Sequence, residues 1–146
     1  MKISTIALCS LSLLAGRDAY AQNLIVNGDF ELGNTGFGTQ YVNAAGNSTE
    51  GQYNVRANPS TWNGAFAPIS DHTPSPGTLM MVINGATSGA LDVWTQSVPV
   101  VPGDTYEFSG WVANLVSGPS ADLSVRINGQ VVVASFDAPS NSFAWN

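Results

Sequence analysis

The most constraining feature of this chain is that, after the first 21 residues, no segment shows the 3.6-residue hydrophobic period of an amphipathic helix. Instead, short runs of β-branched and aromatic residues alternate with Gly, Pro, Asn and Asp, a pattern typical of β-sandwiches and barrels. The clearest example is at 123–136, where an alternating run, an Asn128-Gly129 dipeptide and a second run predict a β-hairpin. The chain is therefore predicted to be all-β.

Further strands are predicted along the rest of the chain, for a total of about eight. They are placed at residues 24–27, 66–69, 79–83, 92–100 and 105–114, with one or two short strands in the Gly- and Asn-rich region 29–64. The continuously apolar run 79–83 fits a strand that is buried on both faces. Residues 101–104, Val-Pro-Gly-Asp, are predicted to form a turn.

The N-terminal residues predict export. Met1-Lys2 gives a positive start, residues 3–15 form an apolar run too short to span a bilayer, and Ala19-Tyr20-Ala21 is a small-x-small cleavage signal. We therefore expect residues 1–21 to be a secretory signal peptide, with an uncleaved N-terminal anchor as the alternative. Cys9, the only cysteine, is removed with the signal, which excludes disulfides and thiol chemistry from the mature chain.

The charge of the mature chain restricts its partners. Residues 22–146 keep two arginines, Arg56 and Arg126, against nine carboxylates, a net charge of −7. Nucleic acid and anionic membranes are recognised through clustered Lys and Arg, so neither is an expected partner. The remaining surface is rich in Asn, Ser, Thr, Gln and Gly, which suits hydrogen bonding to a neutral polar ligand such as a sugar.

Aromatic residues in the irregular first half are the candidates for sugar binding. Tyr41, Tyr53 and Trp62 are placed where binding loops of such folds lie, and aromatic faces stack on the C–H surfaces of pyranoses. Asn63 and Asp71 could donate or accept the accompanying hydrogen bonds. Trp62 is the strongest single candidate. The alternative is that these aromatic side chains cover the ends of the core, as every sandwich requires.

No set of residues predicts catalysis, so the chain is expected not to be an enzyme. His72 is the only histidine, and the Gly-x-Ser-x-Gly motif of a nucleophile elbow does not occur. The Asp71-His72 pair is interpreted as a loop-stabilising or exposed pair. Trp94 and Trp111 lie within predicted strands and are assigned to packing.

Two segments carry a resemblance to a known family. Residues 23–31, Asn-Leu-Ile-Val-Asn-Gly-Asp-Phe-Glu, resemble the opening of galactose-binding-like β-sandwich modules, and residues 93–98 with 102–111 resemble their paired inner strands. Residues 71–85 are similar to a version found in exported bacterial proteins with PEP-CTERM sorting signals. The resemblance implies a jelly-roll β-sandwich over residues 22–146, in a secreted or cell-surface protein of a Gram-negative bacterium.

The resemblance also implies a metal site and a longer domain. Many relatives hold a structural calcium ion with the carboxylate that matches Glu31, and Asp29 lies nearby; oxygen ligands of this kind suit calcium. The alternative is that both are solvated loop carboxylates. The family continues for two more strands past the residues that match 143–145, so we expect this domain to lack its last strands, as a shortened reading frame or as a fragment.

These observations favour a non-catalytic carbohydrate-binding module that contacts an oligo- or polysaccharide at the cell surface or in the extracellular matrix. Two alternatives stay open: a structural surface or matrix protein without a small ligand, and an accessory domain of a larger hydrolase. An exposed pair of aromatic side chains would favour the first function, whereas burial of Tyr41, Tyr53 and Trp62 would favour the structural one. The sequence indicates neither the sugar nor the oligomeric state.

Overall fold

The computed structural model describes residues 22–74, 76–87, 91–117, 121–137 and 145. The expected signal peptide at 1–21 lies outside these residues, as do Phe143 and Ala144 of the C-terminal match. Within the described ranges there is no helix of the length and apolar character needed to cross a membrane.

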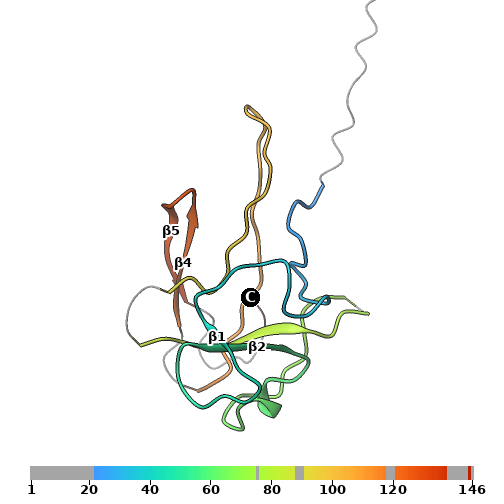
Figure 1. Cartoon of the computed structure of the whole chain (residues 1–146), viewed down its shortest axis with the longest axis vertical. Helices are drawn as coiled ribbons and strands as arrows, with labels where there is room; N and C mark the ends of the chain where they lie inside the picture. Colours follow the sequence, from blue (N-terminus) through green and yellow to red (C-terminus); the bar gives the residue numbers. More distant parts are fainter. Residues whose placement is uncertain (1–21, 75, 88–90, 118–120, 138–144, 146) are drawn as a thin grey trace, which may run out of the picture.

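A three-stranded sheet forms the body of the molecule (Figure 1). It consists of β1 (Val42–Asn43), β2 (Gln52–Arg56) and β3 (Met80–Asn84), in that order. β1 runs parallel to β2, and β2 runs antiparallel to β3, with Tyr53 opposite Ile83. The predicted strand at 79–83 is thus confirmed as β3. Its alternate residues Met80 and Val82 are buried, while the other face of the strand is half-buried.

A separate two-stranded sheet contains the predicted hairpin, which the structure confirms. It joins β4 (Asp122–Ile127) to β5 (Gln130–Asp137) in antiparallel pairing, with an irregularity in the register around Val125. Asn128 and Gly129 both adopt positive φ angles, of 50° and 77°, as a two-residue hairpin turn requires. This hairpin rises away from the body of the molecule (Figure 1).

The structure is all-β, as predicted, but it differs from the expected strand list. In the described ranges there are five strands, one short 3₁₀ turn η1 (Pro59–Thr61) and an isolated bridge between Gly38 and Thr95. The predictions of strands at 24–27, 66–69, 92–100 and 105–114 were wrong. A strand needs a neighbour that offers complementary N–H and C=O groups, and residues 99–111 are exposed throughout instead of lying in a sheet.

The hydrophobic core is small and lies between η1 and β3. Trp62, Met80 and Val82 are buried together, and Phe66, Ile69, Leu115 and Trp145 pack against them. The η1 turn delivers Trp62 to this position, because Asn58 caps the turn through Ser60 and Pro59 begins it. The indole Nε1 of Trp62 then donates to the carbonyl oxygen of Ala44 at 2.8 Å, so the one polar atom of the buried ring is satisfied.

Asn27 organises the N-terminal loop. It is buried and adopts a positive φ of 54°, a conformation that Asn tolerates better than most residues. Its side-chain Nδ2 donates to the carbonyl oxygens of Gly33 and Thr35 at 2.9 and 2.8 Å, and its Oδ1 accepts from the amide of Leu32 at 2.9 Å. One side chain therefore satisfies three backbone groups that no strand reaches.

Replacing Asn27 should accordingly destabilise the fold. We expect Asn27→Ala to lower the free energy of unfolding by about 3 kcal/mol, since three hydrogen bonds of about 1 kcal/mol each are lost and alanine disfavours positive φ. Urea denaturation followed by tryptophan fluorescence measures the change. Asn23→Ala is the control, because Asn23 is exposed and makes only a local bond to Ile25. Equal midpoints for the two variants would contradict the central role of Asn27.

Candidate functional site

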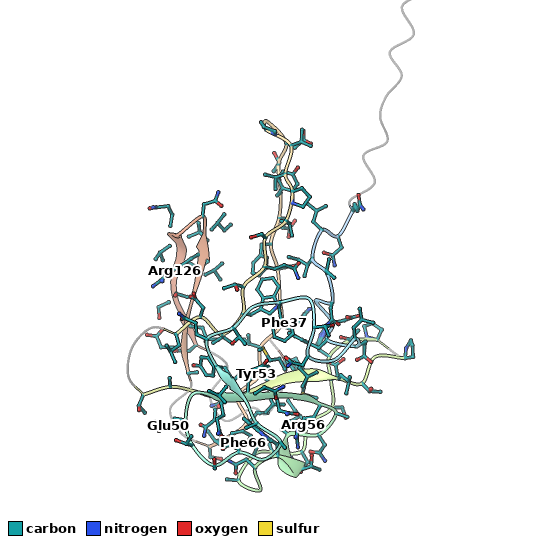
Figure 2. The ribbon with its side chains drawn as sticks, viewed as in Figure 1. Phe37, Glu50, Tyr53, Arg56, Phe66 and Arg126 are labelled. Atoms are coloured by element: carbon teal, nitrogen blue, oxygen red, sulfur yellow. The ribbon has the colours of Figure 1, made fainter. Side chains whose placement is uncertain are left out.

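Two of the three candidate sugar-stacking residues are buried. Trp62 and Tyr53 are each only 4% exposed. Tyr53 donates its hydroxyl hydrogen to Oδ1 of Asn34 and contacts Phe37 edge to face, with ring centroids 6.2 Å apart (Figure 2). Tyr41 is half-buried, and its hydroxyl oxygen accepts from the amide of Ala86 at 3.2 Å. In this structure neither Trp62 nor Tyr53 offers a ring face to a ligand, since both are packing residues.

The two polar candidates differ in how they are used. The side-chain amide of Asn63 is hydrogen-bonded within the protein. Its Nδ2 donates to Oδ1 of Asn47 at 2.8 Å, and its Oδ1 accepts from the amide of Ala65 at 2.9 Å. Asp71 accepts the amide hydrogen of Thr73 through Oδ2 at 3.0 Å. Asp71 also lines a cavity of about 290 Å³, together with Ala57, Ser70, Gly77 and Thr78. Of the two, Asp71 is therefore the one that borders an open space.

An aromatic stack lies directly beside Asp71. The imidazole of His72 stacks on the indole of Trp111, with ring centroids 3.8 Å apart and an angle of 19° between the planes. Trp145 meets His72 edge-on at 6.1 Å, and its Nε1 donates to the carbonyl oxygen of Ser70 at 2.8 Å. Two distant segments, those of Trp111 and Trp145, thus converge on the 70–72 loop. We call the set Asp71, His72 and Trp111 the Trp111 platform.

The prediction that Trp111 packs in the interior was wrong, because this side chain is 58% exposed. Residues 105–114 form no strand that would pair with a sheet and cover the ring, and His72 lies against one of its faces. Sequence reasoning missed the platform because an aromatic residue in an alternating run looks the same whether or not a sheet covers it. Asp71 was named as a candidate, but nothing in the sequence pairs its loop with residue 111.

The electrostatics of the platform suit an uncharged ligand. Asp71 supplies the carboxylate of the platform, and neither Arg56 nor Arg126 is part of it. Arg56 instead donates to Asn54, Thr61 and the carbonyl oxygen of Ala45, and desolvation lowers the pKa of its guanidinium. Arg126 lies on the outlying hairpin (Figure 2). An anionic ligand would therefore meet no arginine on the platform, whereas the hydroxyl groups of a neutral ligand could donate to Asp71.

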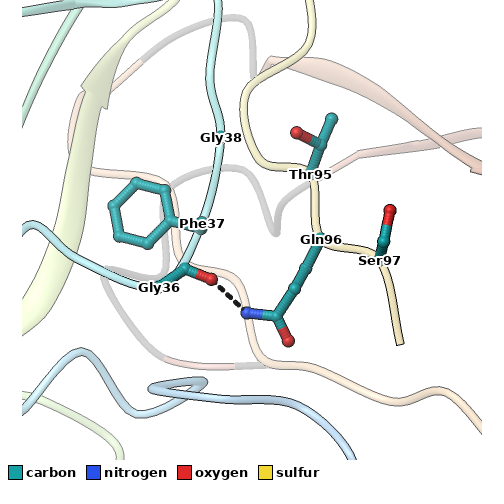
Figure 3. A pocket seen from close by; sticks show the side chains of 6 residues that line it. All are labelled: Gly36, Phe37, Gly38, Thr95, Gln96 and Ser97. Carbon is teal, nitrogen blue, oxygen red and sulfur yellow. Dashed lines mark hydrogen bonds between the residues drawn. The ribbon is translucent and has the colours of Figure 1, made fainter. Parts of the chain in front are cut away.

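A second cavity, of about 350 Å³, lies between two loops (Figure 3). It is lined by Gly36, Phe37, Gly38, Thr95, Gln96 and Ser97. The Gln96 side chain makes the backbone hydrogen bonds that a neighbouring strand would make. Its Oε1 accepts from the amide of Val26 at 2.9 Å, and its Nε2 donates to the carbonyl oxygens of Val26 and Gly36. Because both Nε2 hydrogens and the Oε1 of Gln96 already bind backbone groups, we assign the cavity a structural origin.

Glu31 and Asp29, the proposed calcium ligands, lie in the N-terminal loop. Oε1 of Glu31 accepts from the backbone amides of Thr78 and Leu79, both at 2.6 Å, which ties the N-terminal loop to the start of β3. Oδ1 of Asp29 accepts from the amide of Glu31 at 3.4 Å. The described residues contain no cluster of three or more His, Cys, Asp or Glu side chains suited to a metal ion. Calcium binding at Glu31 stays a prediction.

Comparisons with protein-family models, with curated proteins and with solved structures found no match for this chain. The resemblance to galactose-binding-like modules therefore stays a prediction from the residues quoted above.

Glu31 should stabilise the fold through its two amide contacts. Glu31→Gln keeps the shape of the side chain but removes the charge that strengthens both hydrogen bonds, so we expect a loss of about 1–2 kcal/mol in the free energy of unfolding. Urea denaturation measures this loss against Glu107→Gln, an exposed residue in the 99–111 segment. A loss no larger than that of the control would contradict the anchoring role.

The same pair of variants tests calcium. If Glu31 ligates the ion, added calcium raises the denaturation midpoint of the wild type by mass action and raises it less in Glu31→Gln. Equal denaturation midpoints of the wild type with calcium and with a chelator would contradict calcium binding, and Glu31 would then be a structural anchor alone.

Proposed function

We propose that this chain is a non-catalytic, exported module that binds a neutral oligo- or polysaccharide through the Trp111 platform. The observation that supports this function best is the exposure of Trp111, at 58%, while the ring is stacked on His72. A large aromatic side chain is normally buried because its apolar surface is costly to leave in water. An exposed indole that is held flat by a second ring is suited to stacking on a sugar.

The stack lowers the entropic cost of binding. A free tryptophan side chain would lose rotamer freedom when a ligand immobilised it, at a cost of about 0.5–1.5 kcal/mol. Here His72 already holds one face of the ring, and Trp145 holds His72 through its edge contact and its bond to Ser70. The indole is therefore positioned before a ligand arrives, and Asp71 is the sequence neighbour of the histidine that holds it.

The net charge supports a neutral sugar over an acidic one. The mature chain carries −7, and its field repels uronic acid or sulfated polymers at low salt. A neutral polysaccharide is not repelled, and its hydroxyl groups can donate to Asp71 while its C–H face covers Trp111.

The proposal also covers the type of β fold and the cellular location of the protein. We infer a jelly-roll β-sandwich of the galactose-binding-like type from the resemblance at residues 23–31 and 93–111. The turn expected at 101–104 supports this pattern, with the amide of Asp104 donating to the carbonyl oxygen of Val101 at 3.2 Å and Gly103 at a φ of 92°. The signal-peptide pattern supports secretion or display at the surface of a Gram-negative bacterium. A structural calcium ion at Glu31 and Asp29 completes the proposal.

The second candidate function is that of a structural surface or matrix protein without a small ligand. Two observations favour it: the burial of Trp62 and Tyr53, and the number of apolar side chains left exposed outside the body. The exposed set includes Val100, Val101, Phe108, Ile127, Val131, Val132 and Val133. Such a surface is suited to contacts with other proteins.

Affinity electrophoresis in gels that contain neutral polysaccharides separates the two candidates. We expect selective retention of the wild type on one neutral polymer and no retention on alginate. Trp111→Ala should weaken retention at least about tenfold, since loss of a central aromatic contact costs roughly 1.4 kcal/mol or more. Asp71→Asn should weaken it less.

Phe108→Ala is the matched control, because Phe108 is also aromatic, is 53% exposed and lies on the same extended segment. It should be retained like the wild type. If Trp111→Ala is retained as strongly as the wild type, the platform is not the binding site. If a folded wild type is retained by no neutral polymer, the structural candidate takes its place.

A further inference from the structure

The outer edge of β5 has the properties of a self-association site. β5 pairs with β4 on one side, and no other strand in the described part of the chain lies along its second side. Such an edge presents a row of backbone N–H and C=O groups that can template another strand. A two-stranded hairpin is also marginally stable alone, so a further strand would stabilise it.

Apolar side chains cover this edge strand on both faces. Val131, Val132 and Val133 are all exposed, and so is Ile127 on β4. Because successive side chains of a strand point to opposite faces, the valines leave apolar surface on the two sides of the hairpin at once. The hairpin stands apart from the three-stranded sheet (Figure 1), which therefore does not cover either face.

Natural edge strands are usually protected by charged residues or proline. β5 has neither in its interior: from residue 130 to residue 136 it contains no charge and no proline, and its one charged residue is Asp137 at its end. Residues 22–146 carry a net charge of −7, so two copies repel each other in general. Contact along an uncharged strand brings the fewest like charges together.

The position of Asp137 selects the orientation. In a parallel, in-register pair the two Asp137 side chains would lie directly opposite each other, which is destabilising. In an antiparallel pair with Val133 opposite Val133 of the second copy, the two carboxylates are eight residues apart along the strands, or about 27 Å. That separation exceeds the screening length of about 8 Å at physiological salt. The antiparallel arrangement therefore removes the repulsion.

We infer that β5 pairs antiparallel with β5 of a second copy of this chain, about a two-fold axis near Val133, to form a continuous sheet of order β4-β5-β5-β4. Closed two-fold association of this kind is the commonest in soluble oligomers. The inference is independent of the sugar proposal, because it uses neither the Trp111 platform nor any residue that contacts it.

Sedimentation equilibrium of the purified chain tests this pairing. We expect a monomer–dimer equilibrium within about 1–100 μM, a range suited to a small interface. Val133→Lys should raise the dissociation constant at least about tenfold, because it brings two ammonium groups together at the two-fold axis. Val133→Thr keeps β-branching without charge and should dimerise like the wild type. Val101→Lys, an equally apolar and exposed position away from the hairpin, should also dimerise.

A second measurement needs no variant. Amide hydrogen exchange in β5 should slow as the protein concentration rises, while exchange in the 101–111 segment stays constant. A wild type that stays monomeric over the whole range would overturn the inference. Dimerisation that Val133→Lys leaves intact, or β5 exchange that does not depend on concentration, would overturn it as well, since either places the interface elsewhere.

Discussion

Hydrogen bonds from side chains to the backbone hold the body of this protein together where strands do not reach. Asn27 satisfies three backbone groups of its loop, Gln96 pairs with Val26 as a neighbouring strand would, and Glu31 accepts two amides at the start of β3. A backbone polar group left unpaired inside a protein costs about as much as a lost hydrogen bond. Each of these side chains therefore replaces part of a sheet.

The small core explains why side-chain hydrogen bonds must replace those of a sheet. Trp62, Met80 and Val82 are the members of the buried cluster, with a few half-buried partners around them. Even the ring nitrogens take part, since Trp62 and Trp145 donate to the carbonyl oxygens of Ala44 and Ser70. Apolar burial alone would position few of the loops, so polar contacts with defined directions determine where the loops lie. The 70–72 loop, on which the Trp111 platform depends, is positioned in this way.

The two surfaces with a proposed role arise from the same shortage of neighbours. Trp111 is exposed because residues 105–114 lack a covering sheet, and the valines of β5 are exposed because the hairpin stands away from the body. They differ in chemistry. The platform combines an aromatic face with a carboxylate and suits a sugar, whereas the β5 edge combines uncharged backbone with β-branched side chains and suits another strand.

The local features of this chain follow from its sequence, and its long-range contacts do not. The hairpin at Asn128-Gly129 and the apolar strand β3 were predictable, because turn chemistry and a continuous apolar run act over a few residues. The strands expected at 92–100 and 105–114 were not formed, since a ladder needs a partner that local propensity cannot supply. Likewise, Trp62, the expected ligand contact, is buried, whereas Trp111, expected to pack, is exposed. Whether an aromatic ring is covered depends on which distant segment reaches it, and tertiary structure alone decides that.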